Sequence, residues 1–361
     1  MSKFRLLALS AFTFIIGITS ISAQENIVIG QTFPIKATKL NEDREIQIYL
    51  PKSYSENQDS TQAYPVIYLL DGESNFNYLS AFIEKLSRYP YPAIPEMIIV
   101  GVKNTNRTRD LTPSQKREET MNKAQKDRIQ RESGGNDIFF SFLKDDLMPY
   151  IDNKYRTTGY NILIGHSFGG ITALNNLLNY TDMFNAYIVH DPSVWWDAQY
   201  VLKDYQNKSN HDFKKRKLFL TQVGERESGG HLSDHYTSIK QFKELLDNSH
   251  FKNLSYQYQQ YDDEDHSTIV LKGNLDGLRY LFEDYRVNFK ELKTNPNLLK
   301  DAFAKVSAEL DFSFYPSEAY LKSIVSYFVS SDAIKTAEET VAYCLSIYPD
   351  SDISDLLKKK K

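Results

Sequence analysis

The sequence predicts an α/β fold in which a mostly parallel central sheet is flanked by helices. Short apolar segments rich in β-branched residues alternate along the chain with longer segments of helical periodicity. Residues 65–70 form a continuous apolar run, as a strand buried on both faces of a parallel sheet should. With 361 residues and 41% hydrophobic content, the chain can form one such domain of about 250 to 270 residues and something small besides.

Two antiparallel edge strands come first, and six strands of a parallel core follow. The strands are expected at 27–35, 44–50, 66–70, 97–102, 161–164, 186–190, 217–223 and 255–261. Helices are expected near 76–88, 136–151, 169–180, 233–248 and 271–289. The alternation of strand and helix is typical of βαβ units, which build parallel sheets.

A Gly-x-Ser-x-Gly motif at residues 165–169 joins an expected strand to an expected helix. In that setting the serine adopts strained backbone angles that hold its Oγ clear of the sheet. The residues two before and two after it must lack side chains so that strand and helix can pack closely, and Gly165 and Gly169 meet this demand. We therefore predict Ser167 as a nucleophile; a chance motif in a turn is the alternative.

A nucleophilic serine needs a base and an acid, which in this architecture follow it in the order serine, acid, histidine. His266 is the preferred base, because it lies in a polar loop just after the alternating segment 254–261. The acid is expected after the strand 217–223, where Glu227 is favoured over Glu225. The structural alternatives are a solvated loop charge for each glutamate and a surface position for His266.

Several segments together resemble a known family. They are Tyr-Leu-Leu-Asp-Gly at 68–72, the run 101–113, Ser-Gly-Gly at 133–135, the serine motif, Pro-Ser-Val-Trp-Trp at 192–196 and His-Ser at 266–267. Over roughly residues 27–290 the chain resembles the Putative esterase family of α/β-hydrolases. That family includes esterase D, feruloyl esterases, mycolyltransferases and the enterobactin and salmochelin siderophore esterases, and the likeness to the last group is greatest. The resemblance implies Ser167 as nucleophile and His266 as base; the family varies at the acid, and some members have serine and histidine alone.

The resemblance also implies an oxyanion hole made by the backbone amide of Phe168 and that of Glu73 or Gly72. The residues themselves point to the same place. A loop opening with Asp71 and Gly72 after the buried strand 66–70 would lie beside the serine, at the carboxyl end of the sheet where open α/β folds bind ligands. Two such amide donors would lower the barrier by a few kcal/mol; an Asp-Gly turn without a catalytic part is the alternative.

Two arginines and two tryptophans are candidate substrate-binding residues. Arg107 and Arg109 follow the expected strand 97–102, and arginine offers a planar fork for anionic oxygens and stacks on aromatic rings. Trp195 and Trp196 follow another strand end. Together they would form a wall that binds an acyl or catechol group; for the tryptophans the alternative is core packing beneath the serine motif.

The first 23 residues are predicted to be a signal peptide. Lys3 and Arg5 give a positive start, residues 6–18 are mostly apolar and too short to span a bilayer, and residues 21–23 fit a cleavage site after Ala23. The protein is therefore expected to be periplasmic or secreted, with an uncleaved anchor as the alternative. The hydrolase domain would occupy residues 24–292.

Residues 293–361 are expected to form a helical extension that resembles one tetratricopeptide repeat. The features that it shares with such a repeat are Ala333, Ala337, Val341, Ala342 and the segment 347–349. One repeat cannot bury its own apolar face. The extension should therefore pack on the hydrolase domain or bind a protein partner.

Composition excludes other classes of protein. The formal charge of −4, which becomes −6 without the signal peptide, argues against a nucleic-acid partner. After the first 23 residues no apolar segment could span a membrane, and the single Cys344 rules out an intramolecular disulfide. No cluster of His, Cys, Asp or Glu has metal-ligand spacing, so we expect no metal and no cofactor.

The sequence thus predicts an exported serine esterase with a small-molecule or glycan ester as substrate. The family likeness suggests a catecholate siderophore trilactone or its linear pieces. A feruloyl or acetyl ester of a carbohydrate, acyl transfer in place of hydrolysis, and a binding module on a degenerate hydrolase fold remain as alternatives.

Overall fold

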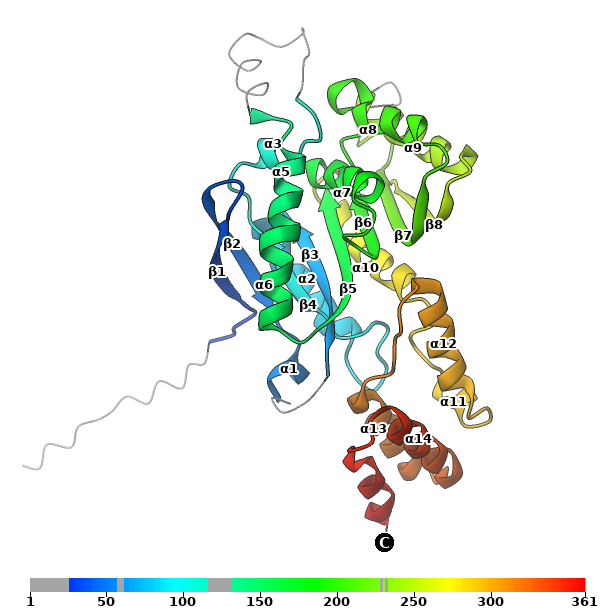
Figure 1. The fold of residues 1–361 in the computed structure, drawn as a ribbon. Helices are drawn as coiled ribbons and strands as arrows, with labels where there is room; N and C mark the ends of the chain where they lie inside the picture. The colour runs from blue at the N-terminus through cyan, green and yellow to red at the C-terminus, as the bar shows by residue number, and fades with distance from the viewer. Residues whose placement is uncertain (1–25, 57–61, 116–131, 228–229, 231–232, 361) are drawn as a thin grey trace, which may run out of the picture.

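An eight-stranded sheet forms the centre of the protein (Figure 1). The structure, a computed structural model, describes residues 26–56, 62–115, 132–227, 230 and 233–360. The strand order is β1-β2-β4-β3-β5-β6-β7-β8, in which β2 runs antiparallel both to β1 and to the six parallel strands β3 to β8. The strands are β1 Gln31–Ala37, β2 Glu42–Tyr49, β3 Tyr64–Leu70, β4 Ile98–Val102, β5 Thr157–His166, β6 Ala186–His190, β7 Asp212–Val223 and β8 Lys252–Tyr261.

All eight predicted strands are present, and the predicted fold class is confirmed. The alternation of side chains along a parallel strand explains why β3 is apolar and buried at every position. In β3, Tyr68 and Leu70 belong to one hydrophobic cluster, while Ile67 and Leu69 belong to the other, on the opposite face. Both faces are therefore covered, as expected of parallel strands.

Helices cover the two faces of the sheet. Their bounds are α1 Lys52–Glu56, α2 Gly72–Leu86, α3 Arg107–Asp110, α5 Asn136–Ser141, η1 Phe142–Leu147, α6 Met148–Lys154, α7 Phe168–Asn179, α8 Trp196–Asn207, α9 Asp234–Asn248 and α10 Ile269–Leu281. Helices α5 to α9 share the first hydrophobic cluster with the sheet, and α2 and α10 share the second. Helix α8 was not predicted, and α10 ends eight residues earlier than the expected 289.

The C-terminal segment is helical, as expected, and it packs on the domain that is built around the sheet. It comprises α11 Phe289–Leu292, α12 Leu298–Leu310, α13 Glu318–Ser330, α14 Ile334–Ile347 and η2 Asp352–Lys360. The ring of Phe314 lies 5.0 Å from that of Tyr160 in β5, and the hydroxyls of Ser317 and Tyr89 are 2.5 Å apart. These contacts lie near the amino end of β3, at the end of the sheet opposite the start of α7 (Figure 1). The tetratricopeptide assignment stays a prediction.

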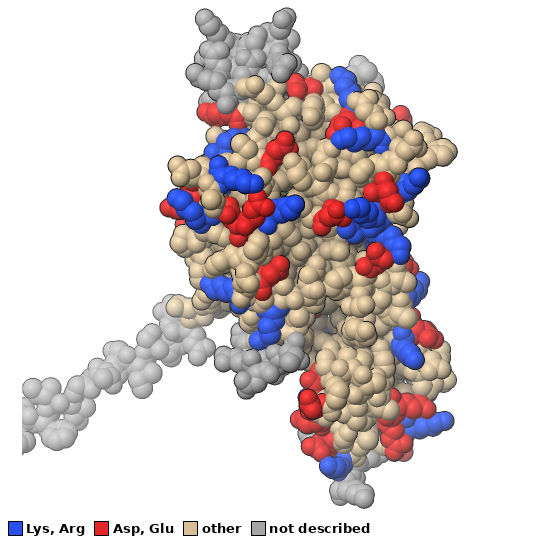
Figure 2. Space-filling view, in the orientation of Figure 1, with Lys and Arg blue, Asp and Glu red and all other residues tan. Residues whose placement is uncertain are grey.

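Charges of both signs are interspersed on the face shown in Figure 2, where neither sign forms a large patch of its own.

Within the described part of the chain, no helix combines the length and the apolar character that a membrane span requires. The predicted signal peptide, residues 1–23, lies outside the described residues.

Candidate active site

Ser167 occupies a sharp turn between the end of β5 and the start of α7. Its backbone angles, φ of 58° and ψ of −113°, lie in a region that residues other than glycine rarely adopt. A Cβ on Gly165 would lie 2.2 Å from the carbonyl oxygen of Gly169, so no larger residue fits there. The turn is held by the Ser167 amide, which donates to the carbonyl of His190, and by its carbonyl, which accepts from the amide of Ser193. This is the strand-turn-helix geometry that the motif predicts.

The hydroxyl of Ser167 lies 3.3 Å from that of Ser193, a buried residue in the loop after β6. Among the described residues no hydrogen bond joins Ser167 Oγ to His266. The two belong to the same site nonetheless, because the ring of His166, which precedes Ser167, lies 4.4 Å from the ring of His266. Nucleophile and base are often further apart before substrate binds than during the reaction.

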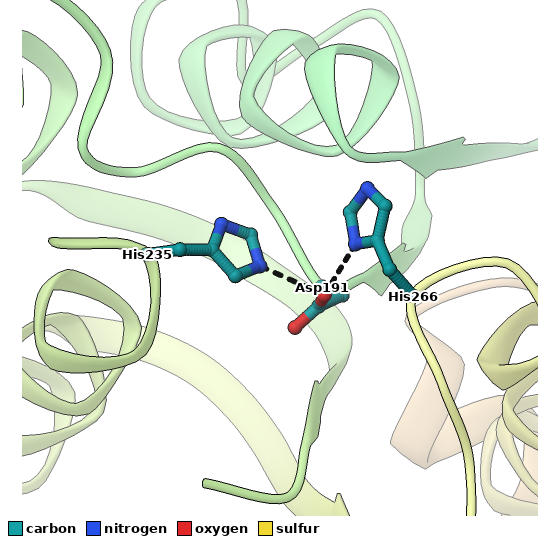
Figure 3. Close-up of side chains that lie close together, drawn as sticks. All are labelled: Asp191, His235 and His266. Carbon is teal, nitrogen blue, oxygen red and sulfur yellow. Dashed lines mark hydrogen bonds and ion pairs between the residues drawn. The ribbon is translucent and has the colours of Figure 1, made fainter. Parts of the chain in front are cut away.

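The acid that contacts His266 is Asp191, the residue directly after β6 (Figure 3). Its Oδ2 accepts hydrogen bonds from His266 Nδ1 at 2.5 Å and from His235 Nε2 at 2.8 Å, and its Oδ1 accepts one from the amide of Val223. Burial of this fully buried carboxyl opposes its charge, but the hydrogen bonds from His235 and His266 outweigh burial and lower the pKa of Asp191 below its usual range. The group is therefore an anion at neutral pH.

The structure thus places Asp191 where the sequence analysis expected Glu227. Glu227 lies in the exposed turn after β7, and its carboxylate is 3.6 Å from the side chain of Arg226. Glu225 lies in the same turn. The order serine, acid, histidine still holds, but the acid comes from one strand earlier. The one local feature of Asp191 is its place directly after the buried strand β6, and Glu227 likewise follows a buried strand end, so this feature does not single out the acid.

Two neutral histidines lie around the site. Burial lowers the pKa of His166 to about 3, helped by the neighbouring His266 and His190, and burial also lowers the pKa of His190 to about 4. His190 is held by Thr221 and by Asn274, at 3.2 and 3.0 Å. Because both rings stay uncharged at neutral pH, they do not compete with His266 for the charge of Asp191.

The amides proposed for the oxyanion hole are the first of two helices. Phe168 begins α7, Gly72 and Glu73 begin α2, and the amides of a first helical turn have no partner within their own helix. The two starts are close, because a Cβ on Gly169 would lie 3.3 Å from the carboxylate of Asp71. The carboxylate of Glu73 accepts a hydrogen bond from the side-chain amide of Asn104. The role of these amides stays a prediction.

Arg107 lies at the site but is bound to protein. Its Nε and Nη2 donate to the two carboxylate oxygens of Asp71 at 2.6 and 2.9 Å, and its guanidinium lies 5.3 Å from the ring centre of Phe168. The same Nη2 is 3.5 Å from the carbonyl of His166. Arg107 therefore connects the loop before α2 to the serine turn, whereas the sequence analysis placed it in a substrate wall.

Arg109 is turned away from the site into a separate ion-pair network. It donates to both carboxylate oxygens of Glu42 at 2.7 and 3.0 Å and to Asp110 at 2.7 Å. Asp110 is fully buried and also accepts from the buried Arg44 at 2.7 Å. The donors of Arg109 thus pair two carboxylates of the protein, and these contacts give no support to the predicted substrate-binding role, which stays a prediction.

The two tryptophans differ. Trp196 is buried, its ring meets that of Phe168 edge-on at 5.0 Å, and its Nε1 donates to the carbonyl of Ser114. Trp196 therefore packs in the core beneath the serine motif, which was the alternative to a role in substrate binding. Trp195 is partly exposed, 6.4 Å from the ring of Phe168, and so presents an aromatic surface beside the serine turn.

These features define a serine hydrolase with the α/β-hydrolase fold. The chain belongs to the family described as Putative esterase, whose model matches residues 37–270, and the family resemblance is confirmed. Members of this family act on ester bonds.

Curated relatives of the chain include named esterases. The ferri-bacillibactin esterase BesA of Bacillus subtilis is 30% identical over 207 residues, which are 55% of this chain and 69% of BesA. The siderophore triacetylfusarinine C esterase of Aspergillus fumigatus is 25% identical over 174 residues, 42% of this chain and 60% of that protein. The chain thus matches only part of the length of each.

A solved structure matches almost the whole chain. An IroE-like serine hydrolase from Shewanella oneidensis is 30% identical, with a TM-score of 0.79, and the match covers 88% of this chain and 99% of that one. The enterobactin esterase FES of Shigella flexneri, at 18% identity and a TM-score of 0.52 over 71% of this chain and 60% of FES, shares the fold.

Proposed function

We propose that this protein hydrolyses the carboxylic esters of a siderophore with Ser167 as nucleophile, His266 as base and Asp191 as acid. The observation that carries the proposal is the buried Asp191 carboxylate on His266 Nδ1, next to a serine in a strained turn. An imidazole that donates from Nδ1 has its lone pair on Nε2, which is the tautomer that a general base requires.

The reaction follows from this arrangement. His266 Nε2 takes the proton of Ser167 as Oγ attacks the ester carbonyl, and the buried Asp191 stabilises the imidazolium. The carbonyl oxygen becomes an anion, which the amides of Phe168 and of Gly72 or Glu73 would stabilise. His266 then protonates the departing alcohol, leaving an acyl-serine that a water molecule, deprotonated by His266, hydrolyses to the acid.

The substrate class rests on the relatives and on the site. BesA is named as a ferri-bacillibactin esterase, and the Aspergillus enzyme as an esterase of the siderophore triacetylfusarinine C. We infer that a catecholate trilactone or its linear pieces is the substrate here, with Trp195 as the exposed aromatic surface on which a catechol ring could stack. Arg107 contributes indirectly, through the loop that it holds.

The experiment is a comparison of esters with the purified chain. We expect kcat/KM for a catecholate trilactone, iron-free or ferric, to exceed that for feruloylated or acetylated sugars by about 100-fold or more. Ser167→Ala should lower every ester hydrolysis by about 10³-fold or more while the circular dichroism spectrum is unchanged. A preference for sugar esters, or acyl transfer to an added sugar in place of hydrolysis, would overturn the siderophore assignment.

We also propose that the chain is exported, on the strength of residues 1–23 alone. Expression with the native N-terminus, cell fractionation and N-terminal sequencing test this. A mature protein that begins at Gln24 and lies outside the cytoplasm supports export. A full-length chain retained in the cytoplasm contradicts it.

A further inference from the structure

Two histidines share one carboxylate oxygen in the candidate site, and the proposed reaction uses only one of them. His235 comes from the first turn of α9, His266 from the loop after β8, and Asp191 from the end of β6 (Figure 3). The ligand atoms of the three residues, one from each, all lie within 4.8 Å of one another. General base catalysis at Ser167 gives no part to His235.

The chemistry of the three groups suits a divalent transition metal ion. Two imidazoles and a carboxylate are ligands that zinc binds in proteins, with bonds of about 2.0 to 2.2 Å. The ligand atoms around a tetrahedral ion are therefore roughly 3 to 3.5 Å from one another. The distances from Asp191 Oδ2 to His266 Nδ1 and His235 Nε2 are 2.5 and 2.8 Å. Small rotations of the two rings would therefore admit an ion in place of the two N–H protons.

Charge and access also favour a cation. Within the described residues no lysine or arginine pairs with Asp191, so the histidines are its only cationic partners when protonated. The carboxylate is itself fixed from behind, because its Oδ1 accepts from the amide of Val223. The His266 side chain is 43% exposed and that of His235 19%, so solvent reaches both rings while the Asp191 side chain is buried.

We propose that Asp191, His235 and His266 form a binding site for a divalent ion of the zinc class, and that its occupation switches the esterase off. This rests on the proposed function. A metal bond at His266 Nδ1 leaves the proton of the neutral ring on Nε2, where no lone pair then remains to accept the proton of Ser167. The ion also takes the Asp191 oxygen that would stabilise the imidazolium. Metal binding and catalysis therefore exclude one another.

The test uses Zn²⁺ with the purified chain, without a histidine tag. Zn²⁺ should inhibit hydrolysis of a p-nitrophenyl ester, and a chelator should restore it, whereas the same concentration of Mg²⁺, which prefers oxygen ligands, should not inhibit. We expect the inhibition constant for Zn²⁺ to be roughly 100-fold or more higher in His235→Gln, because one of three protein ligands is lost. The inhibition of each variant is measured against its own uninhibited rate. His250→Gln, which removes an exposed histidine outside the cluster, is the matched control and should leave the inhibition constant unchanged.

A binding measurement separates this proposal from the proposed function. Calorimetry on Ser167→Ala should show one Zn²⁺ per chain, and the double variant with His235→Gln should lose that binding. His235→Asn, checked by thermal unfolding, is a second variant in case the first misfolds. Absence of turnover with any ester would contradict the proposed function and leave the calorimetry to decide the metal site. Zinc inhibition that persists unchanged in His235→Gln, or no binding to Ser167→Ala, would overturn the metal site.

Discussion

Asp191 Oδ2 lies 2.5 Å from His266 Nδ1, although 75 positions separate the two residues in the chain. The contact joins the end of β6 to the loop after β8, so it depends on the sheet order, in which only β7 lies between them. It also sets the tautomer of His266, because the ring nitrogen that faces a carboxylate is the one that carries the proton.

The first prediction concerns this pair. Asp191→Asn keeps the shape of the side chain but removes the charge that stabilises the imidazolium, so kcat for a p-nitrophenyl ester should fall by about 10³- to 10⁴-fold. Glu227→Gln, in the exposed turn after β7, is the control and should stay within about twofold of wild type. Equal and negligible effects of both changes would instead point to a dyad of Ser167 and His266.

The strands and the serine turn could be predicted because the signals for them are local. A continuous apolar run predicts β3, and glycines at fixed spacing predict the turn at Ser167. The acid depends instead on which strand end brings a carboxylate to His266. Both Asp191 and Glu227 follow apolar strands, and nothing local distinguishes them.

The ion pairs of the two arginines could not be predicted for a related reason. The loop sequence shows that Arg107 and Arg109 lie near a strand end, but not whether their charges are already matched. Their partners Asp71 and Glu42 are 36 and 67 positions away. Such pairs follow from the packing of the whole fold, so the charge of a loop residue alone does not predict that it is available to a ligand.

The second prediction is that Arg109 stabilises the fold and has no part in catalysis. Arg109→Ala leaves the buried Asp110 with Arg44 alone and Glu42 with one partner fewer, and we expect the free energy of unfolding to fall by about 2 kcal/mol. Urea unfolding measures this.

The matched control for Arg109→Ala is an exposed ion pair. Lys214→Ala, which breaks the pair with Asp182, should cost well under 1 kcal/mol. An Arg109→Ala variant that is as stable as wild type but loses kcat/KM would contradict the structural role.

The third prediction concerns the pH dependence of stability through Glu42. The hydrogen bond from Arg109 is the main cause that lowers the pKa of Glu42 below its ordinary 4.5. A carboxyl whose pKa is lower in the folded state stabilises the fold at pH values above its unfolded pKa, and this contribution is lost as the pH falls through the folded pKa. Wild type should therefore be more stable than Glu42→Gln at neutral pH, and the difference should shrink at acid pH.

Urea unfolding of both proteins, from neutral pH to below 4.5, checks this sign. A difference in stability that grows on acidification would show that Glu42 is not held as an anion by Arg109.

The last prediction separates two roles for Arg107. If Arg107 holds the loop before α2 against the serine turn, Arg107→Ala should lower kcat for a small neutral ester as well as for a catecholate ester, because both need the same oxyanion hole. We expect a loss of about 10- to 100-fold, less than that for removing an oxyanion donor outright. Arg107→Lys should restore little, since a lysine cannot make the two parallel hydrogen bonds to Asp71. Arg109→Ala removes the same charge from the same loop without touching the turn, and should keep kcat near that of wild type. A loss confined to anionic aromatic esters would instead return Arg107 to the substrate wall, since only a group that contacts the substrate can tell those esters from small neutral ones.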